Sequence, residues 1–197
     1  SGSCQSAMAF ATEYDGRVQV VNNQRISVTQ RQSALDALQL ATAGKNAAEI
    51  KEFLENDKFN SSIYIMLDTL YYLKKGGRIT PAAAAIGTML RLKPVLTIQG
   101  EKLDAFAKAR TTSQGKTMMI NAIKKDINER FGGMTEDKHI WLQIAYTHDR
   151  AAAEQFRTEV EAEFPGYDIH MDPLSLSVAC HIGPGSLALA CCKKINV

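Results

Sequence analysis

Hydrophobic and polar residues in the first third of the chain follow a pattern that predicts strands interleaved with helices. Apolar residues recur at helical spacing in two segments, and the second of these follows Asn46 and Glu49, which form a capping pair. Two β-branched runs predict short strands. The expected order is a strand over 17–22, a helix over 29–43, a helix over 47–55 and a strand over 62–67. This alternation is typical of a layered α/β unit with a parallel sheet.

The pattern changes near residue 68. A short helix over 69–75 ends at Gly76-Gly77, a pair that readily adopts positive φ at a helix end. Another helix starts at 80–81 and ends before Pro94. The remaining elements are hairpin strands over 94–98 and 103–107, a helix over 113–131, a strand over 139–147, a helix over 149–164, a strand over 167–171 and an apolar C-terminal segment. This part is expected to be α+β with mostly antiparallel pairing.

The fold class is therefore α/β, with two parts. Residues 1–67 are the remainder of a layered α/β domain with a parallel sheet, and residues 68–197 form an α+β domain with a mostly antiparallel sheet. No flexible Gly/Ser linker separates the two, so we expect them to share a face, where ligands tend to sit. The chain opens at Ser1 rather than Met, and we expect it to be a fragment that lacks an upstream segment.

Composition and charge narrow the class of protein. The 197 residues are 45% hydrophobic and 22% charged, which is typical of a globular protein. A net charge of +2 does not favour nucleic acid as a partner. No apolar run reaches the roughly eighteen residues that a membrane span needs, so a cytoplasmic location is expected. The four cysteines have no metal-ligand spacing, so we expect neither a metal nor a redox site.

Two glycine-containing loops could hold an anion. The opening loop, with the hydroxyls of Ser1 and Ser3, precedes a helix whose positive end attracts anions, although an ordinary N-cap is the favoured interpretation of this segment taken alone. The second loop carries Arg78 just after Gly76-Gly77, where its planar guanidinium suits carboxylate or phosphate oxygens. A helix C-cap with basic residues is the alternative interpretation of this loop.

His181 and Arg110 are the other candidates. His181 precedes a Gly- and Pro-rich loop and can donate or accept a proton near neutral pH, whereas a lone histidine is more often a structural residue. Arg110 lies at the end of the predicted hairpin, where a solvated basic turn is the simpler explanation. No nucleotide-binding loop, hydrolase nucleophile elbow or metalloprotease helix motif occurs.

Five segments together resemble one family. They are the SGSCQSA opening, DTL with YLKKGGRI over 68–79, LKPVL over 92–96, KAR over 108–110 and HIGPG over 181–185. In this order they resemble the DegV family of bacterial fatty-acid-binding proteins, which includes the FakB subunits of fatty acid kinase. The resemblance covers essentially the whole chain. We expect the chain to lack the α/β segment with which family members usually begin.

The resemblance implies a carrier rather than an enzyme. A long-chain fatty acid would lie non-covalently in an apolar tunnel, and a separate kinase subunit would phosphorylate its carboxylate to an acyl phosphate for phospholipid synthesis. Ser1 and His181 would hydrogen-bond the carboxylate, with Ser3 supplying a further hydroxyl, and no cofactor is needed. Arg78 and Arg110 would support either the phosphorylated head group or the kinase docking surface. Transient contact with a membrane surface is compatible with this role.

Two other functions stay open on the residues alone. One is an enzyme that acts on acyl or phosphoryl groups, with His181 as acid/base and with Arg78 and Arg110 as an electrostatic clamp. The other is an anion-dependent regulatory or nucleic-acid-binding module, which the small net charge does not favour.

Overall fold

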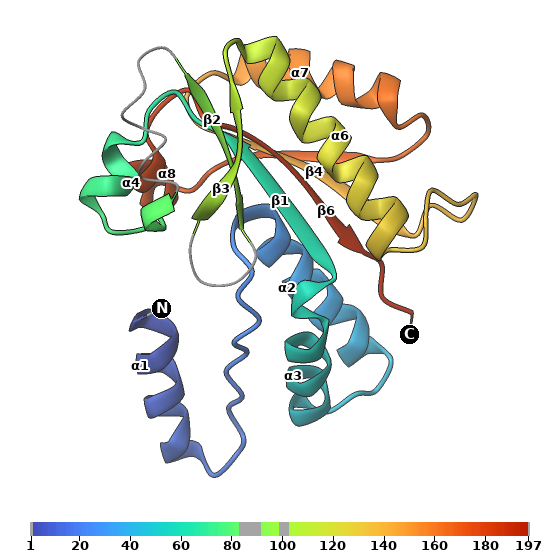
Figure 1. Cartoon of the computed structure of the whole chain (residues 1–197). Helices are drawn as coiled ribbons and strands as arrows, with labels where there is room; N and C mark the ends of the chain where they lie inside the picture. Colours follow the sequence, from blue (N-terminus) through green and yellow to red (C-terminus); the bar gives the residue numbers. More distant parts are fainter. Residues whose placement is uncertain (1, 83–91, 99–102, 197) are drawn as a thin grey trace.

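A computed structural model describes residues 2–82, 92–98 and 103–196 (Figure 1). In this part of the chain six strands form one sheet in the order β3-β2-β1-β6-β4-β5. The strands are β1 (Ser61–Met66), β2 (Lys93–Ile98), β3 (Leu103–Ala109), β4 (Ile140–Tyr146), β5 (Ile169–Pro173) and β6 (Leu187–Lys193). Every neighbouring pair is antiparallel except β4–β5, which is parallel. The predicted α/β class, with both kinds of pairing, is confirmed.

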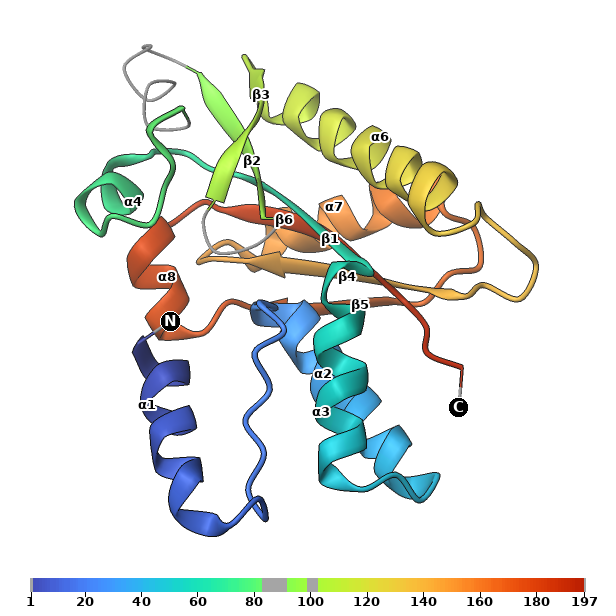
Figure 2. The same ribbon diagram turned by 60° about the horizontal axis from the view of Figure 1, so that its bottom comes forward.

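Helices cover both faces and one end of this sheet. The helices in the described ranges are α1 (Gly2–Ala11), which buries no residue, α2 (Ser27–Thr42), α3 (Ala47–Asn56), α4 (Tyr71–Lys75), α6 (Thr112–Arg130), α7 (Arg150–Glu163) and α8 (Leu176–Ile182), with short 3-10 turns η1 (Thr12–Tyr14) and η2 (Asp57–Phe59). Figures 1 and 2 show α6 and α7 on one face, α2 and α3 on the other, and α4 beside α8 at one end of the sheet.

The alternation of side chains along each strand divides the core into two clusters. In β1, Tyr64 and Met66 point to the face that α6 and α7 cover, where Phe156 is fully buried. Ile63 and Ile65 point to the opposite face, where side chains of α2, α4 and α8 pack. Because β1 is buried on both faces, its residues from Ile63 to Met66 are all apolar instead of alternating with polar ones.

Two predicted helix ends are confirmed in detail. Asn46 caps α3 by accepting the backbone N–H groups of residues 48 and 49, and its own N–H donates to Glu49 Oε2 at 2.9 Å. At the end of α4, the Arg78 N–H donates to the Leu73 carbonyl at 3.1 Å and the Gly77 N–H donates to the Lys74 carbonyl at 3.2 Å. This is a Schellman motif, which needs the positive φ of +63° that Gly77 adopts.

Some predicted elements differ from the structure. The prediction of a strand over 17–22 is wrong, because this segment is irregular. A hydrogen bond from the Asn22 N–H to Glu55 Oε1 at 2.9 Å holds its end. A strand needs a ladder partner, and no described strand pairs with this segment. Helix α8 was not predicted, because the Gly and Pro residues that follow it suggested a loop. The predicted helix that begins at 80–81 falls outside the described residues after Ala82.

The pairing of β1 bears on the predicted division at residue 67. Both neighbours of β1, β2 and β6, come from beyond that position, and both are antiparallel to it, whereas a parallel sheet was expected for residues 1–67. The division itself stays a prediction.

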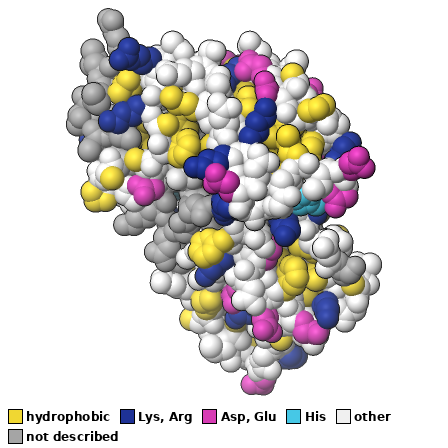
Figure 3. All heavy atoms as spheres, turned by 45° about the vertical axis from the view of Figure 1, so that its right-hand side comes forward, with side chains coloured by type: hydrophobic (Ala, Val, Ile, Leu, Met, Phe, Trp, Pro, Cys, Tyr) yellow, Lys and Arg dark blue, Asp and Glu magenta, His cyan; other side chains and the backbone are white. Residues whose placement is uncertain are grey.

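No helix in the described ranges is long and apolar enough to cross a membrane. Charges of both signs are interspersed on the face that Figure 3 shows.

Candidate functional site

Several strands begin or end together at one end of the sheet, which we call the His181 end. The last residue of β1, Met66, pairs with Leu187 at the start of β6, which also pairs with Tyr146 at the end of β4. On the other side, Lys93 at the start of β2 pairs with Ala109 at the end of β3. The loops that connect these strands therefore emerge on the same side, as do α4 and α8.

The imidazole of His181 lies against the turn that ends α4. It is half-buried in the last turn of α8, and a Cβ built on Gly76 would lie 3.4 Å from its Nδ1 and 3.6 Å from Arg78 Cγ. No hydrogen bond from a described residue reaches the imidazole. The structure therefore brings His181 and the base of the Arg78 side chain to the same turn, at Gly76.

A buried hydrogen-bond cluster holds the turn that follows His181. The Thr147 hydroxyl donates to the Gly183 carbonyl at 2.8 Å and accepts the Ser186 N–H at 2.9 Å. The Ser186 hydroxyl also donates to the Gly183 carbonyl, at 3.2 Å. This cluster fixes the turn to the end of β4, which Thr147 directly follows.

Two glycines in the same turn allow close packing against the segment after β1. Gly183 has φ +80°, and a Cβ on it would lie 2.5 Å from the Tyr72 ring. Gly185 has φ +75° and lies so close to the Asp68 carboxylate that a Cβ would collide with it. Asp68 is paired with Lys93 Nζ at 2.5 Å. The DTL, LKPVL and HIGPG segments therefore meet at the His181 end.

The other predicted site residues are placed less closely. Ser1 lies outside the described residues, and Ser3 is exposed in the first turn of α1, where no hydrogen bond joins it to His181. Arg110 follows β3 at the His181 end, and its N–H donates to Gln114 Oε1 at 2.8 Å. Ile79 pairs with Leu103 at the opposite end of β3, so the backbones of Arg78 and Arg110 are separated by the length of that strand, roughly 20 Å at the usual rise per residue.

The structure adds Thr147, Tyr72 and Asp68 to the predicted set. Asp68 and Tyr72 lie within the segments that carried the family resemblance, so a signal for them existed. Thr147 had none, because its partner Gly183 is 36 residues further along the chain.

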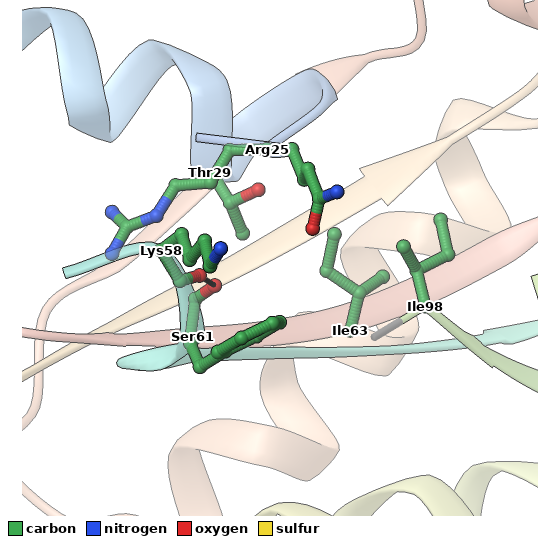
Figure 4. Close-up of a pocket in the computed structure, with 8 residues that line it drawn as sticks. Arg25, Thr29, Lys58, Ser61, Ile63 and Ile98 are labelled. Carbon is green, nitrogen blue, oxygen red and sulfur yellow. Dashed lines mark hydrogen bonds between the residues drawn. The ribbon is translucent and has the colours of Figure 1, made fainter. Parts of the chain in front are cut away.

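A narrow pocket lies at the opposite end of β1 (Figure 4). It is lined by Gln24, Arg25, Thr29, Lys58, Phe59, Ser61, Ile63 and Ile98. It has room for little more than a water molecule. The guanidinium of Arg25 points away from Ile63 and Ile98 and donates to Asp57 Oδ2 at 2.6 Å. The same Nη2 group donates to the Asp57 carbonyl at 2.9 Å, whereas Nε and Nη1 of Arg25 are buried and have no hydrogen-bond partner among the described residues.

The apolar tunnel stays a prediction. Small residues that would leave room for a fatty-acid tail, Ala82 to Ala85 and Gly87, lie mostly outside the described residues. Met66 and Met119, which are long and flexible enough to adapt to a tail, pack instead in the cluster beneath α6 and α7. In the described residues no group of three or more His, Cys, Asp or Glu side chains could hold a metal ion.

Comparisons with known proteins give one consistent result. The model of a family described as "Uncharacterised protein, DegV family" matches residues 1–194. A DegV domain-containing protein of Streptomyces coelicolor is 31% identical over 190 residues, which cover 96% of this chain and 65% of that protein. The chain thus spans about 65% of the length of the curated relatives it matches.

Solved structures agree with this assignment. The structure described as "Fatty acid binding of a DegV family protein" from Thermus thermophilus matches with a TM-score of 0.86 and 31% identity, over 98% of this chain and 67% of that one. The Bacillus subtilis structure described as "DegV, a fatty acid binding protein" has a TM-score of 0.82 and 24% identity, over 98% and 67% of the two chains. The second likeness shows the fold alone.

Proposed function

We propose that this chain, which belongs to the DegV family, is a lipid carrier that holds a long-chain fatty acid non-covalently and presents its carboxylate to a separate kinase for phosphorylation. The similar proteins of Thermus thermophilus and Bacillus subtilis are described as binding fatty acids. That this chain also binds a fatty acid, and that a kinase is its partner, are our proposal.

The observation that carries the proposal is the half-buried imidazole of His181 beside the base of Arg78. A carboxylate needs N–H or O–H donors, and an imidazole and a guanidinium are side chains that supply them. Both residues lie at the edge of the cluster that contains Leu70, Leu73 and Ile182, all buried. A ligand here would meet donors at one end and apolar side chains at the other.

The tail would supply most of the affinity. Burying about fifteen methylenes at about 0.8 kcal/mol each contributes roughly 12 kcal/mol before the cost of immobilising the ligand is subtracted. The partly buried side chains on the face that α2, α4 and α8 cover offer a surface for this tail; they include Ile98, Leu103, Leu174 and Val178. The head group then needs only to be oriented, and no cofactor is required.

The remaining site residues are assigned by the resemblance. Ser1, with Ser3 nearby in the chain, would add hydroxyls to the carboxylate. Of the two roles that the resemblance gives Arg110, docking of the kinase fits better than support of the head group, because its backbone is separated from that of Arg78 by the length of β3. Arg110 and Lys93 lie at the same end of the sheet, where a docked enzyme would approach. We expect the protein to be cytoplasmic, without nucleic acid as a partner and with at most transient contact with a membrane surface.

Native mass spectrometry of the purified chain mixed with oleate tests the carrier function. One bound oleate per chain is expected. His181→Ala should slow the transfer of phosphate to oleate by about tenfold, because one hydrogen bond to a charged group is lost, and should weaken tail binding less. His170→Ala, which removes another half-buried imidazole, should change neither. A chain that never binds oleate would refute the proposal.

A second assay separates the carrier from the enzyme. The chain is incubated with ATP, magnesium and oleate, with and without a fatty acid kinase. Acyl phosphate is expected only when the kinase is present. Acyl phosphate made by the chain alone would show that the chain is itself the enzyme.

A further inference from the structure

The turn after His181 is tied to β4 by a single buried side chain. Thr147 is 5% exposed, and its hydroxyl both donates to the Gly183 carbonyl and accepts the Ser186 N–H. Its own N–H donates to the Ser186 carbonyl at 3.0 Å. The backbone of residues 183–186 thus takes three of its hydrogen bonds from one residue at the end of the sheet.

We infer that Thr147 is a positioning residue that sets where the His181 imidazole lies, an inference that rests on the proposed function of His181. The Gly183 N–H donates to the Ala179 carbonyl at 2.8 Å and so closes α8. Gly183 therefore links two units: its N–H belongs to the helix that carries His181, and its carbonyl belongs to the Thr147 cluster. A shift of that carbonyl would move the last turn of α8.

The surroundings of His181 leave little room for such a shift to be absorbed. Tyr72 packs on Gly183, and Gly76 packs on His181 itself. At the other end, Thr147 is followed by His148, which holds a strained φ of +67°, and by Asp149, whose side chain caps α7. Thr147 thus lies between β4 and the start of α7, and its hydrogen bonds reach the turn after α8. The position of His181 therefore depends on the hydrogen bonds of Thr147.

Thr29 offers a matched control elsewhere in the fold. Its hydroxyl also donates to a backbone carbonyl, that of Ile26 at 2.9 Å, and accepts a backbone N–H, that of the same residue at 3.3 Å. Like Thr147 it is buried, but it lies at the start of α2. Replacing either threonine by valine removes the same kind of bonds at nearly constant volume.

The test compares Thr147→Val, Thr147→Ser and Thr29→Val in the whole chain. Two quantities are measured: the imidazole signals of His181 in nitrogen–proton NMR, assigned with His181→Gln, and the rate of oleate release. Thr147→Val is expected to move the His181 signals and to speed release about fivefold, the equivalent of one net hydrogen bond. Thr147→Ser, which keeps the hydroxyl, should restore both. Thr29→Val should lower stability similarly while leaving the His181 signals unchanged.

Unchanged His181 signals in a folded Thr147→Val chain would overturn the inference, even if oleate still binds to the unaltered chain. Moved signals in a chain that never binds oleate would support the positioning role and refute the proposed function instead. If Thr147→Val does not fold, Ser186→Ala removes one hydroxyl from the same carbonyl. A shift of the His181 signals in that variant supports the inference, and their constancy overturns it.

Discussion

Replacing Gly183 by alanine tests the packing of α8 against α4. Gly183 holds φ +80° and ψ 178°, a backbone region that is essentially restricted to glycine and costs other residues about 1–3 kcal/mol. The new Cβ would lie 2.5 Å from Tyr72 Cδ2 and 2.6 Å from Cε2, whereas carbon atoms in contact are normally about 3.5–4.0 Å apart. The Tyr72 ring must then rotate away, and overpacking of this kind costs about 1–3 kcal/mol. We expect Gly183→Ala to lower the free energy of unfolding by about 3 kcal/mol in total.

Urea unfolding followed by circular dichroism measures this effect. Gly77→Ala is the matched control, because Gly77 also has positive φ but its Cβ would meet no atom within 4 Å; about 1 kcal/mol is expected there. In a Tyr72→Ala background the ring is gone, so Gly183→Ala should cost about 1–2 kcal/mol less than in the original chain. The reasoning is refuted if Gly183→Ala costs no more than Gly77→Ala, or if removing the ring does not change its cost.

Three further predictions concern the rest of the fold. Asn46→Ala should lower the free energy of unfolding by about 1 kcal/mol in urea titrations, because two N–H groups lose their acceptor; no change would show that the cap is unused. Phe156→Ala should cost about 3–5 kcal/mol and Leu176→Ala, which is 81% exposed, less than about 0.5 kcal/mol; similar losses in calorimetry would contradict the assigned core. Burial raises the pKa of Asp36 above its ordinary value of 3.8, so its contribution to stability is complete below that pH and is lost as the pH rises through the native pKa. Asp36→Asn should remove this slope, and a carboxyl NMR midpoint at or below 3.8 would rule the shift out.

Hydrophobic periodicity predicts those helices that bury one stripe of apolar side chains and those strands that bury one apolar run. Helices α2, α3 and α6 begin and end within about two residues of their predicted bounds, since caps and glycines mark their ends. The segment over 17–22 has strand composition, but none of the described strands pairs with it, and pairing is decided by distant parts of the chain. Strand order could not be predicted for the same reason: β6 lies between β1 and β4 because of contacts that no local pattern encodes.

The candidate site was predicted through its segments rather than through its geometry. No spacing in the sequence places His181 against Gly76, and only the resemblance joined the two. Local chemistry did mark both positions, since two glycines before an arginine and a histidine before a glycine-rich turn are unusual. Thr147 escaped notice because a threonine at the end of a strand is ordinary until its hydrogen-bond partners are known.

The position of β6 has a consequence for biosynthesis. Ser61 pairs with Cys192, so the middle of the sheet is completed only when residues far later in the chain than β1 have left the ribosome. Until they emerge, β1 and β4 each expose an unpaired edge, and contacts this distant in the chain form slowly. His181, only a few residues ahead of β6, acquires its neighbours in the same step. A nascent chain that stalls before that step would therefore carry both an aggregation-prone edge and an unformed head-group site.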